Sequence, residues 1–156
     1  MDDSRTADPE PIIFPLRGGD AAGGPTWVRA RSIVDAAATD AAVTIDVPDG
    51  HVLHVDPALL TGLLRQWVDR ACRVTAASTV IGRREVVVTS VLLPDAIELE
   101  VADSGDAPDA ADSAWFTRQA AVAGRLGATL DVRPCAEGGT ALTLRFARRL
   151  TERRAA

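Results

Sequence analysis

Two polar side chains that can bind an anion lie four residues apart in a predicted helix. Gln66 and Arg70 follow the helix start Asp56-Pro57, so a helix places both on one face, away from the apolar residues. The Arg70 guanidinium can pair with a phosphate but has no lone pair for a metal ion, and the Gln66 amide cannot act as a base. The chemistry that this face allows is phosphate binding without a metal.

A second candidate site follows a predicted strand. Asp103 and Gly105 come directly after the alternating run of Ile97, Leu99 and Val101. The Asp103 carboxylate accepts hydrogen bonds, and a glycine lets the backbone pass close to another group. Since a turn that ends the strand explains the same residues, both interpretations stay open.

Other catalytic arrangements find little support in the sequence. There is no Gly-x-Ser-x-Gly string to place a nucleophile, and the absence of Lys excludes a Gly-x-x-x-x-Gly-Lys phosphate loop. His51 and His54 lie three residues apart on a predicted strand and point to opposite faces, which disfavours a shared metal. Cys72 and Cys135 fall in different predicted elements, and we expect reduced, buried thiols.

The composition is that of a single globular domain. The 156 residues are 47% hydrophobic and 25% charged, with 17 basic and 22 acidic residues. A net charge of −5 and a pI near 5.0 argue against a nucleic-acid or anionic-membrane surface. The apolar runs are too short for a bilayer span and the N-terminus lacks a secretion signal, so we expect a cytoplasmic protein.

The chain ends differ from the rest in composition. Residues 1–25 combine acidic residues with four prolines and four glycines, which predicts a disordered arm whose one apolar patch is Ile12-Ile13-Phe14. That patch could dock on the domain or on a partner. We expect the folded domain over residues 26–149 and a basic tail over residues 150–156.

Periodicity predicts three helices and six strands in this domain. The order is helix, strand, strand, three times over, with the first helix starting at Thr26 and the central helix at Pro57. The third helix is expected to be capped by Asp112 or Ser113 and to end at Gly127. We therefore expect an α+β fold: a two-layer α/β sandwich in which about three helices cover one face of a mixed sheet. The strands are expected at 42–47, 51–55, 85–92, 96–102, 128–133 and 140–147.

Three short sequence motifs lie at the start of the central helix, at the end of a central strand and at the start of the last strand. They are 55–60 (VDPALL), 97–105 (IELEVADSG) and 138–144 (GGTALTL). Together they resemble the ATP-binding domain that histidine kinases share with DNA gyrase, MutL and heat-shock chaperones, the GHKL or Bergerat fold. The resemblance covers nearly all of the folded chain, from Trp27 to Arg148.

The resemblance implies an ATP site, from which the sequence departs. Asp103 matches the aspartate that accepts a hydrogen bond from the adenine amino group, and Gly105 matches the glycine beside the base. Gln66 and Arg70 stand at the positions of the carboxylate or Asn and of the magnesium-binding Asn, and the chain contains no Asn. Ala107 replaces a second glycine.

The phosphate-binding part departs further from the family. The string 113–116 (SAWF) stands where the family has a glycine-rich turn, and only about nine residues separate Asp103 from the third helix, too few for the usual lid. Trp115 and Phe116 are predicted to face the core. The alternatives are that they plug the nucleotide cavity or form a partner-binding patch.

The leading hypothesis is a degenerate histidine-kinase-like ATPase domain that acts as a non-catalytic interaction or regulatory module in bacterial signal transduction. Its vestigial pocket comprises Gln66, Arg70, Asp103 and Gly105, with no catalytic residue and no magnesium. We expect a regulatory protein partner, no nucleic acid and no membrane; a homodimer stays open. The alternative is an ATP- or ADP-binding domain with residual kinase or ATPase activity, as in two-component or anti-sigma kinases. A third possibility is a purine-like ligand bound without metal.

Overall fold

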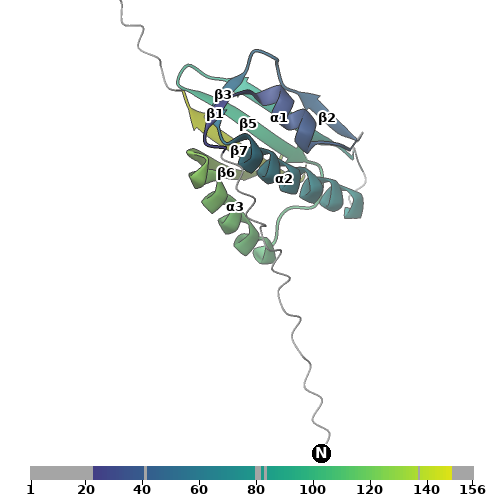
Figure 1. Cartoon of the computed structure of the whole chain (residues 1–156). Helices are drawn as coiled ribbons and strands as arrows, with labels where there is room; N and C mark the ends of the chain where they lie inside the picture. The colour runs from purple at the N-terminus through teal and green to yellow at the C-terminus, as the bar shows by residue number, and fades with distance from the viewer. Residues whose placement is uncertain (1–22, 41, 80–81, 83, 137, 149–156) are drawn as a thin grey trace, which may run out of the picture.

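The computed structural model describes residues 23–40, 42–79, 82, 84–136 and 138–148 (Figure 1). Most of the expected arm at 1–25 and all of the expected basic tail at 150–156 lie outside these residues. Residues 23–25 are exposed and have no regular secondary structure. None of the helices in the described part is long and apolar enough to span a membrane.

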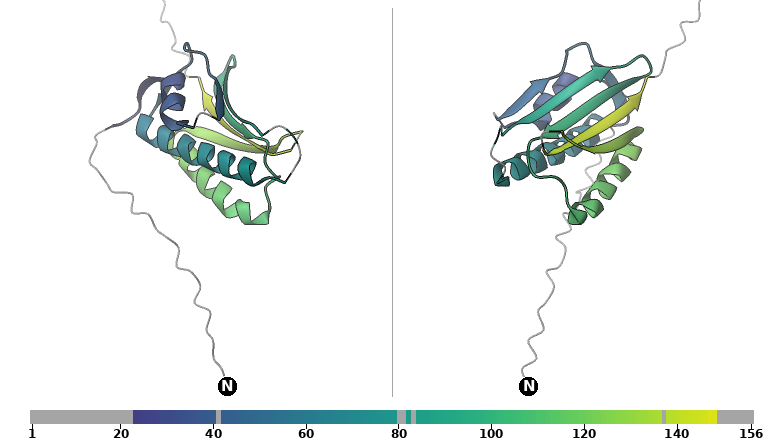
Figure 2. Two further views of the ribbon diagram at one scale, coloured as in Figure 1. Left: turned by 90° about the vertical axis from the view of Figure 1, so that its right-hand side faces the viewer. Right: turned by 180° about the vertical axis from the view of Figure 1, so that it is seen from behind.

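The fold is the expected two-layer arrangement. Three helices, α1 (Ala30–Ala37), α2 (Pro57–Ala77) and α3 (Ser113–Arg125), lie on one face of a five-stranded sheet, and the other face is open (Figure 2). The strand order is β2-β4-β5-β7-β6. The strands are β2 (Val43–Asp46), β4 (Val86–Leu92), β5 (Ala96–Asp103), β6 (Ala128–Pro134) and β7 (Thr140–Ala147).

The sheet is mixed, as predicted. β2 pairs with β4 in parallel, whereas the β4–β5, β5–β7 and β6–β7 pairs are antiparallel. Buried residues alternate along the central strand β5, where Leu99 and Val101 face the helices while Glu98 and Glu100 face outward. The register therefore sends Asp103, at the end of β5, to the helix-covered face.

The predicted helix start at Thr26 is wrong. Residues 26–29 form the strand β1 (Thr26–Arg29), which pairs antiparallel with β3 (Val52–Val55) and places Trp27 opposite His54. The helical spacing holds from Ala30, whose backbone N–H donates to the His51 carbonyl at 2.8 Å. Long-range pairing of an aromatic and a β-branched residue with β3 overrides the local helical pattern here.

The central helix α2 begins where the sequence predicts. The Asp56 carboxylate accepts hydrogen bonds from the backbone N–H groups of Ala58 and Leu59, and Pro57 occupies the first turn. Its apolar face packs against the sheet, with Leu60, Leu64 and Trp67 fully buried. This packing fixes the rotation of α2 and with it the direction of Arg70.

The start of α3 differs from the expected capping. The Asp112 side chain makes no cap bond to α3; instead Asp109 caps a short 3₁₀ turn, η1 (Ala110–Asp112), and Asp112 accepts a hydrogen bond from the Asp109 N–H. The predicted end of α3 at Gly127 is confirmed by a left-handed backbone conformation with φ of 72°. The Asp112 carboxylate is therefore left with an oxygen directed toward α2.

Candidate functional site

Arg70 is the centre of a buried ionic cluster between α2, β5 and the start of α3. Its side chain is only 7% exposed, although it carries a full charge. Nη2 lies 3.1 Å from Asp112 Oδ1, and Nη1 lies 3.8 Å from Asp103 Oδ2. Two carboxylates thus compensate the charge of one buried guanidinium, as a buried cation requires.

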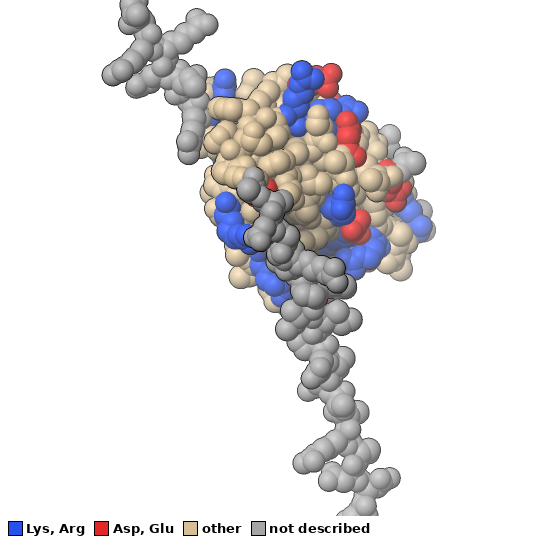
Figure 3. Space-filling model, viewed as in Figure 1, with Lys and Arg blue, Asp and Glu red and all other residues tan. Residues whose placement is uncertain are grey.

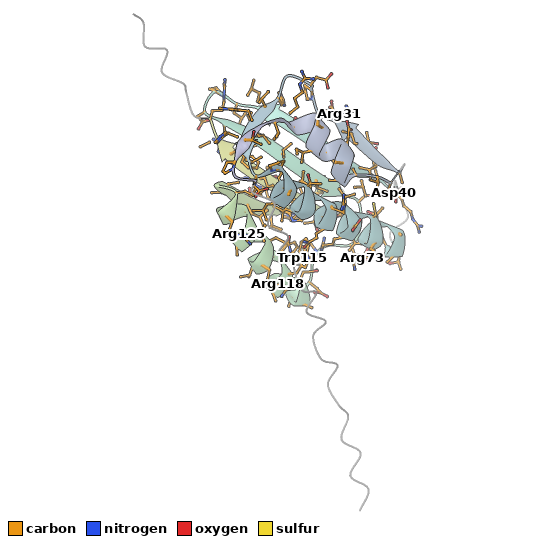
Figure 4. All side chains as sticks on the ribbon, viewed as in Figure 1. Arg31, Asp40, Arg73, Trp115, Arg118 and Arg125 are labelled. Carbon is orange, nitrogen blue, oxygen red and sulfur yellow. The ribbon has the colours of Figure 1, made fainter. Side chains whose placement is uncertain are left out.

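Two aromatic rings from the first turn of α3 complete the cluster. The Arg70 guanidinium carbon lies 5.2 Å from the centre of the Trp115 ring and 5.1 Å from that of Phe116, within the range of cation–π attraction. The two rings contact each other edge to face at 5.3 Å. In Figure 4, Trp115 lies between α3 and α2. Both rings are half-buried and pack against the core, as the sequence predicts.

The two carboxylates experience opposite effects on their acidity. Burial raises the pKa of Asp103 above its ordinary value, although hydrogen bonds from the Gly105 and Thr140 backbone and the charge of Arg70 oppose the shift. At Asp112 burial also acts upward, but the Asp109 N–H and the Arg70 guanidinium outweigh it and lower the pKa. Asp112 is therefore the firmer anionic partner of Arg70, in agreement with its shorter distance.

Close backbone packing around Asp103 requires glycine at two positions. A Cβ atom at Gly105 would lie 2.9 Å from the Val74 carbonyl carbon, and the Gly105 N–H donates to Asp103 Oδ1 at 2.9 Å. Gly139 has a φ of +87°, and a Cβ atom there would lie 1.8 Å from the Asp103 carbonyl oxygen. These glycines let the chain close tightly over the end of β5.

Two hydroxyls in the buried part of the domain have no hydrogen-bond partner among the described residues. They belong to Thr75 on α2 and Thr140 at the start of β7. Thr140 is fully buried, and its backbone N–H donates to the Asp103 carboxylate. An unpaired hydroxyl beside a buried carboxylate is a polar position that a small molecule or a water can satisfy.

Several solved structures from histidine kinases share this architecture. The chain superposes on the ATP-binding domain of PrrB from Mycobacterium tuberculosis with a TM-score of 0.62 and 19% identity, over 80% of this chain and 97% of that one. The histidine kinase domain of the Escherichia coli osmosensor EnvZ gives a TM-score of 0.65 and 11% identity, over 85% and 94%. The cytoplasmic segment of the histidine kinase QseC gives 0.56 and 17%, over 81% and 80%.

This chain has the histidine kinase ATP-binding domain fold. The sequence matches no protein-family model and no curated protein sequence. The fold that the three motifs predict is therefore confirmed by structure alone.

Within this histidine kinase fold, three of the four predicted site residues come together. Arg70, Asp103 and Gly105 form one buried group, whereas Gln66 lies one turn earlier on α2 and is exposed. Asp112 completes the group and was not among the predicted site residues, because its sequence context resembles an ordinary helix cap. Arg70 and Asp112 are 42 residues apart in the sequence, so no local sequence pattern indicates that they pair.

Magnesium does not fit this group as it stands. At the position where the resemblance places a magnesium ligand, the guanidinium of Arg70 is a cation with no lone pair. Among the residues that the structure describes, no three His, Cys, Asp or Glu side chains gather in a metal-binding arrangement. Asp103, the residue matching the adenine-binding aspartate, is itself paired with Arg70.

Proposed function

We propose that this chain is a degenerate histidine-kinase-like domain that does not turn over magnesium-ATP and acts through protein contacts in bacterial two-component signalling. The observation that carries the proposal is the position of Arg70, held between Asp103 and Asp112 and stacked on Trp115 and Phe116. The histidine kinase fold supports the setting in signalling.

The cluster acts against magnesium-dependent catalysis in two ways. A guanidinium repels a divalent cation that approaches within a few ångströms. The same guanidinium contacts Asp112, Trp115 and Phe116. These contacts hold the start of α3, the segment that would cover a nucleotide, against α2. On this proposal, a nucleotide reaches Asp103 only when these contacts break.

The charge distribution fits a protein partner better than a nucleic acid. The chain carries a net charge of −5, and Figure 3 shows acidic side chains next to Arg side chains on the upper and right-hand parts of the visible face. A regulatory protein is the partner that we propose.

Calorimetric titration of ATP and ADP, with and without magnesium, into the full chain tests the proposal. We expect no heat of binding with magnesium-ATP and no phosphate release. Binding at micromolar affinity that Asp103→Ala abolishes, with Arg73→Ala as a surface control, overturns it. Arg73 is exposed on the same helix and makes none of the contacts of Arg70.

A second candidate function rests on the unpaired Thr140 hydroxyl beside Asp103. It is the binding of ATP, ADP or another purine-like ligand without metal, with Arg70 turning from Asp112 to a phosphate, and with residual kinase or ATPase activity of the two-component or anti-sigma type. Binding that Arg70→Ala weakens and EDTA leaves unchanged selects this candidate over the first.

A further inference from the structure

Three of the four large exposed apolar side chains of the described residues gather at one end of the domain. Trp27, Val52 and Leu92 are 59%, 39% and 48% exposed, and all three line one cavity of about 370 Å³. The cavity lies between the β1–β3 pair, the ends of β4 and β7 and the C-terminal end of α3. Clustered rather than scattered exposure of large apolar side chains is typical of an interaction site.

The cavity is distinct from the ionic cluster of Arg70 and has its own electrostatic character. None of the residues that line it is acidic, although the chain as a whole has a net charge of −5. Arg148 and His54 supply its polar wall, and the His54 ring contacts Trp27 at 5.0 Å. The surface therefore fits an apolar segment that carries negative charge.

The chain itself contains such a segment, N-terminal to the described residues. Residues 8–16 read DPEPIIFPL: two acidic residues followed by three large apolar ones between prolines. Prolines favour the extended polyproline II conformation, which loses little entropy when it docks on an aromatic surface. The whole stretch of residues 1–22 has five acidic and two basic residues, which complements Arg148.

The residues that connect this segment to β1 are numerous enough to let it reach the cavity and few enough to keep it nearby. The chain enters the described domain immediately before β1, whose Trp27 forms one wall of the cavity. Eleven residues lie between Phe14 and Thr26, and the extended chain from one to the other reaches about 40 Å. Docking requires the chain to turn back toward the cavity, and the glycine pairs at 18–19 and 23–24 allow the backbone conformations of such a turn. A tether of this length also gives a millimolar effective concentration.

We propose that residues 11–16 of this chain occupy the cavity beside Trp27 and cover its exposed apolar wall. The apolar residues Ile12 and Phe14 match the apolar character of Trp27 and Leu92, and the acidic residues Asp8 and Glu10 match the positive charge of Arg148. The site is independent of whether the domain binds a nucleotide.

The first test follows the indole N–H resonance of Trp27 in the full chain, assigned with Trp27→Phe. Phe14→Asp, which places a charge in the docking segment, is expected to shift this resonance. Ala7→Asp adds the same charge outside the segment and is expected to leave it in place. An unchanged Trp27 resonance in Phe14→Asp overturns the proposal.

The second test uses a synthetic peptide of residues 8–19. We expect it to bind the Phe14→Asp chain at least tenfold more tightly than the wild-type chain, in which the cavity is already filled. Leu92→Asp in the Phe14→Asp background is expected to abolish binding, whereas Val91→Asp, equally exposed but outside the cavity lining, preserves it. Equal affinity for wild type and Phe14→Asp overturns the proposal.

Sedimentation distinguishes the source of the occupant. A monomer at all concentrations agrees with docking within one chain. A concentration-dependent dimer that Phe14→Asp dissociates makes a second copy the occupant and overturns the intramolecular proposal.

Discussion

The indole N–H of Trp67 on α2 donates a hydrogen bond to the side-chain oxygen of Gln119 on α3 at 3.0 Å, and both residues are buried. This bond joins the helix that carries Arg70 to the helix that carries Trp115 and Phe116. α3 is thus held to α2 at two levels, by a neutral hydrogen bond in the core and by the ionic cluster near its first turn.

Gln119→Leu is expected to lower the free energy of unfolding by about 1–3 kcal/mol, because it leaves a buried indole N–H without an acceptor. Urea unfolding of the full chain measures the change. The matched control is Gln66→Leu, at an exposed position on α2, for which we expect a change within about 0.5 kcal/mol. Equal effects at the two positions contradict the role of the hydrogen bond.

Arg70→Ala is expected to lower the free energy of unfolding by about 3 kcal/mol. The substitution leaves buried Asp103 without its counter-charge and removes the contacts with Trp115 and Phe116. The exposed neighbour one turn away provides the control, since Arg73→Ala changes stability by at most about 0.5 kcal/mol. A loss below about 1 kcal/mol for Arg70→Ala means that the cluster does not hold α3.

The lowered pKa of Asp112 predicts an acid-sensitive contact. Because the folded-state pKa lies below the ordinary value of 3.8, the stability that Asp112 contributes is present above pH 3.8 and is lost as the pH falls through the lowered value. Asp112→Asn removes this contribution and so flattens the decline in stability on the acid side. Urea midpoints of both proteins between pH 2 and 6 measure it. If Asp112→Asn loses as much stability between pH 6 and pH 2 as the wild type does, other carboxyl groups cause the loss.

Two glycine substitutions should have opposite signs. Gly105→Ala places a methyl group 2.9 Å from the Val74 backbone, and we expect a loss of about 1–3 kcal/mol from the forced shift. Gly62→Ala adds a methyl group to the exposed face of α2, where no atom other than those of its chain neighbours and of the helix's own backbone lies within 4 Å. It is expected to stabilise the protein by about 0.5–1 kcal/mol. Thermal unfolding of both variants checks the pair, and equal shifts contradict the crowding at Gly105.

The sequence predicts the architecture well because its signals are local. Alternation along residues 97–101, the Asp56-Pro57 helix start and the position of Gly127 each report on a few neighbouring residues. β1 is missed because Trp27 fits a helical spacing with Ala30 and Ile33, and only pairing with β3, about 25 residues later, makes residues 26–29 a strand. Local patterns do not encode such partners.

The candidate site shows the same limit. Arg70 and Asp103 are singled out by their places in the helix and after the strand, and their proximity follows from the fold. The pairing of Arg70 with Asp112 depends on the side chain of a residue that every local rule assigns to a helix cap. Gln66 shares a helix face with Arg70, but only Arg70 is buried, and periodicity along the helix does not indicate which of the two a neighbouring element covers.

Gly139 offers a criterion for recognising relatives of this chain. Its backbone lies so close to the Asp103 carbonyl that no side chain fits, and its φ of +87° independently disfavours every other residue type. A related chain with a different residue at this position must therefore have moved the end of β5 away from the start of β7. Such a chain has a rebuilt site, however similar the rest of its sequence is.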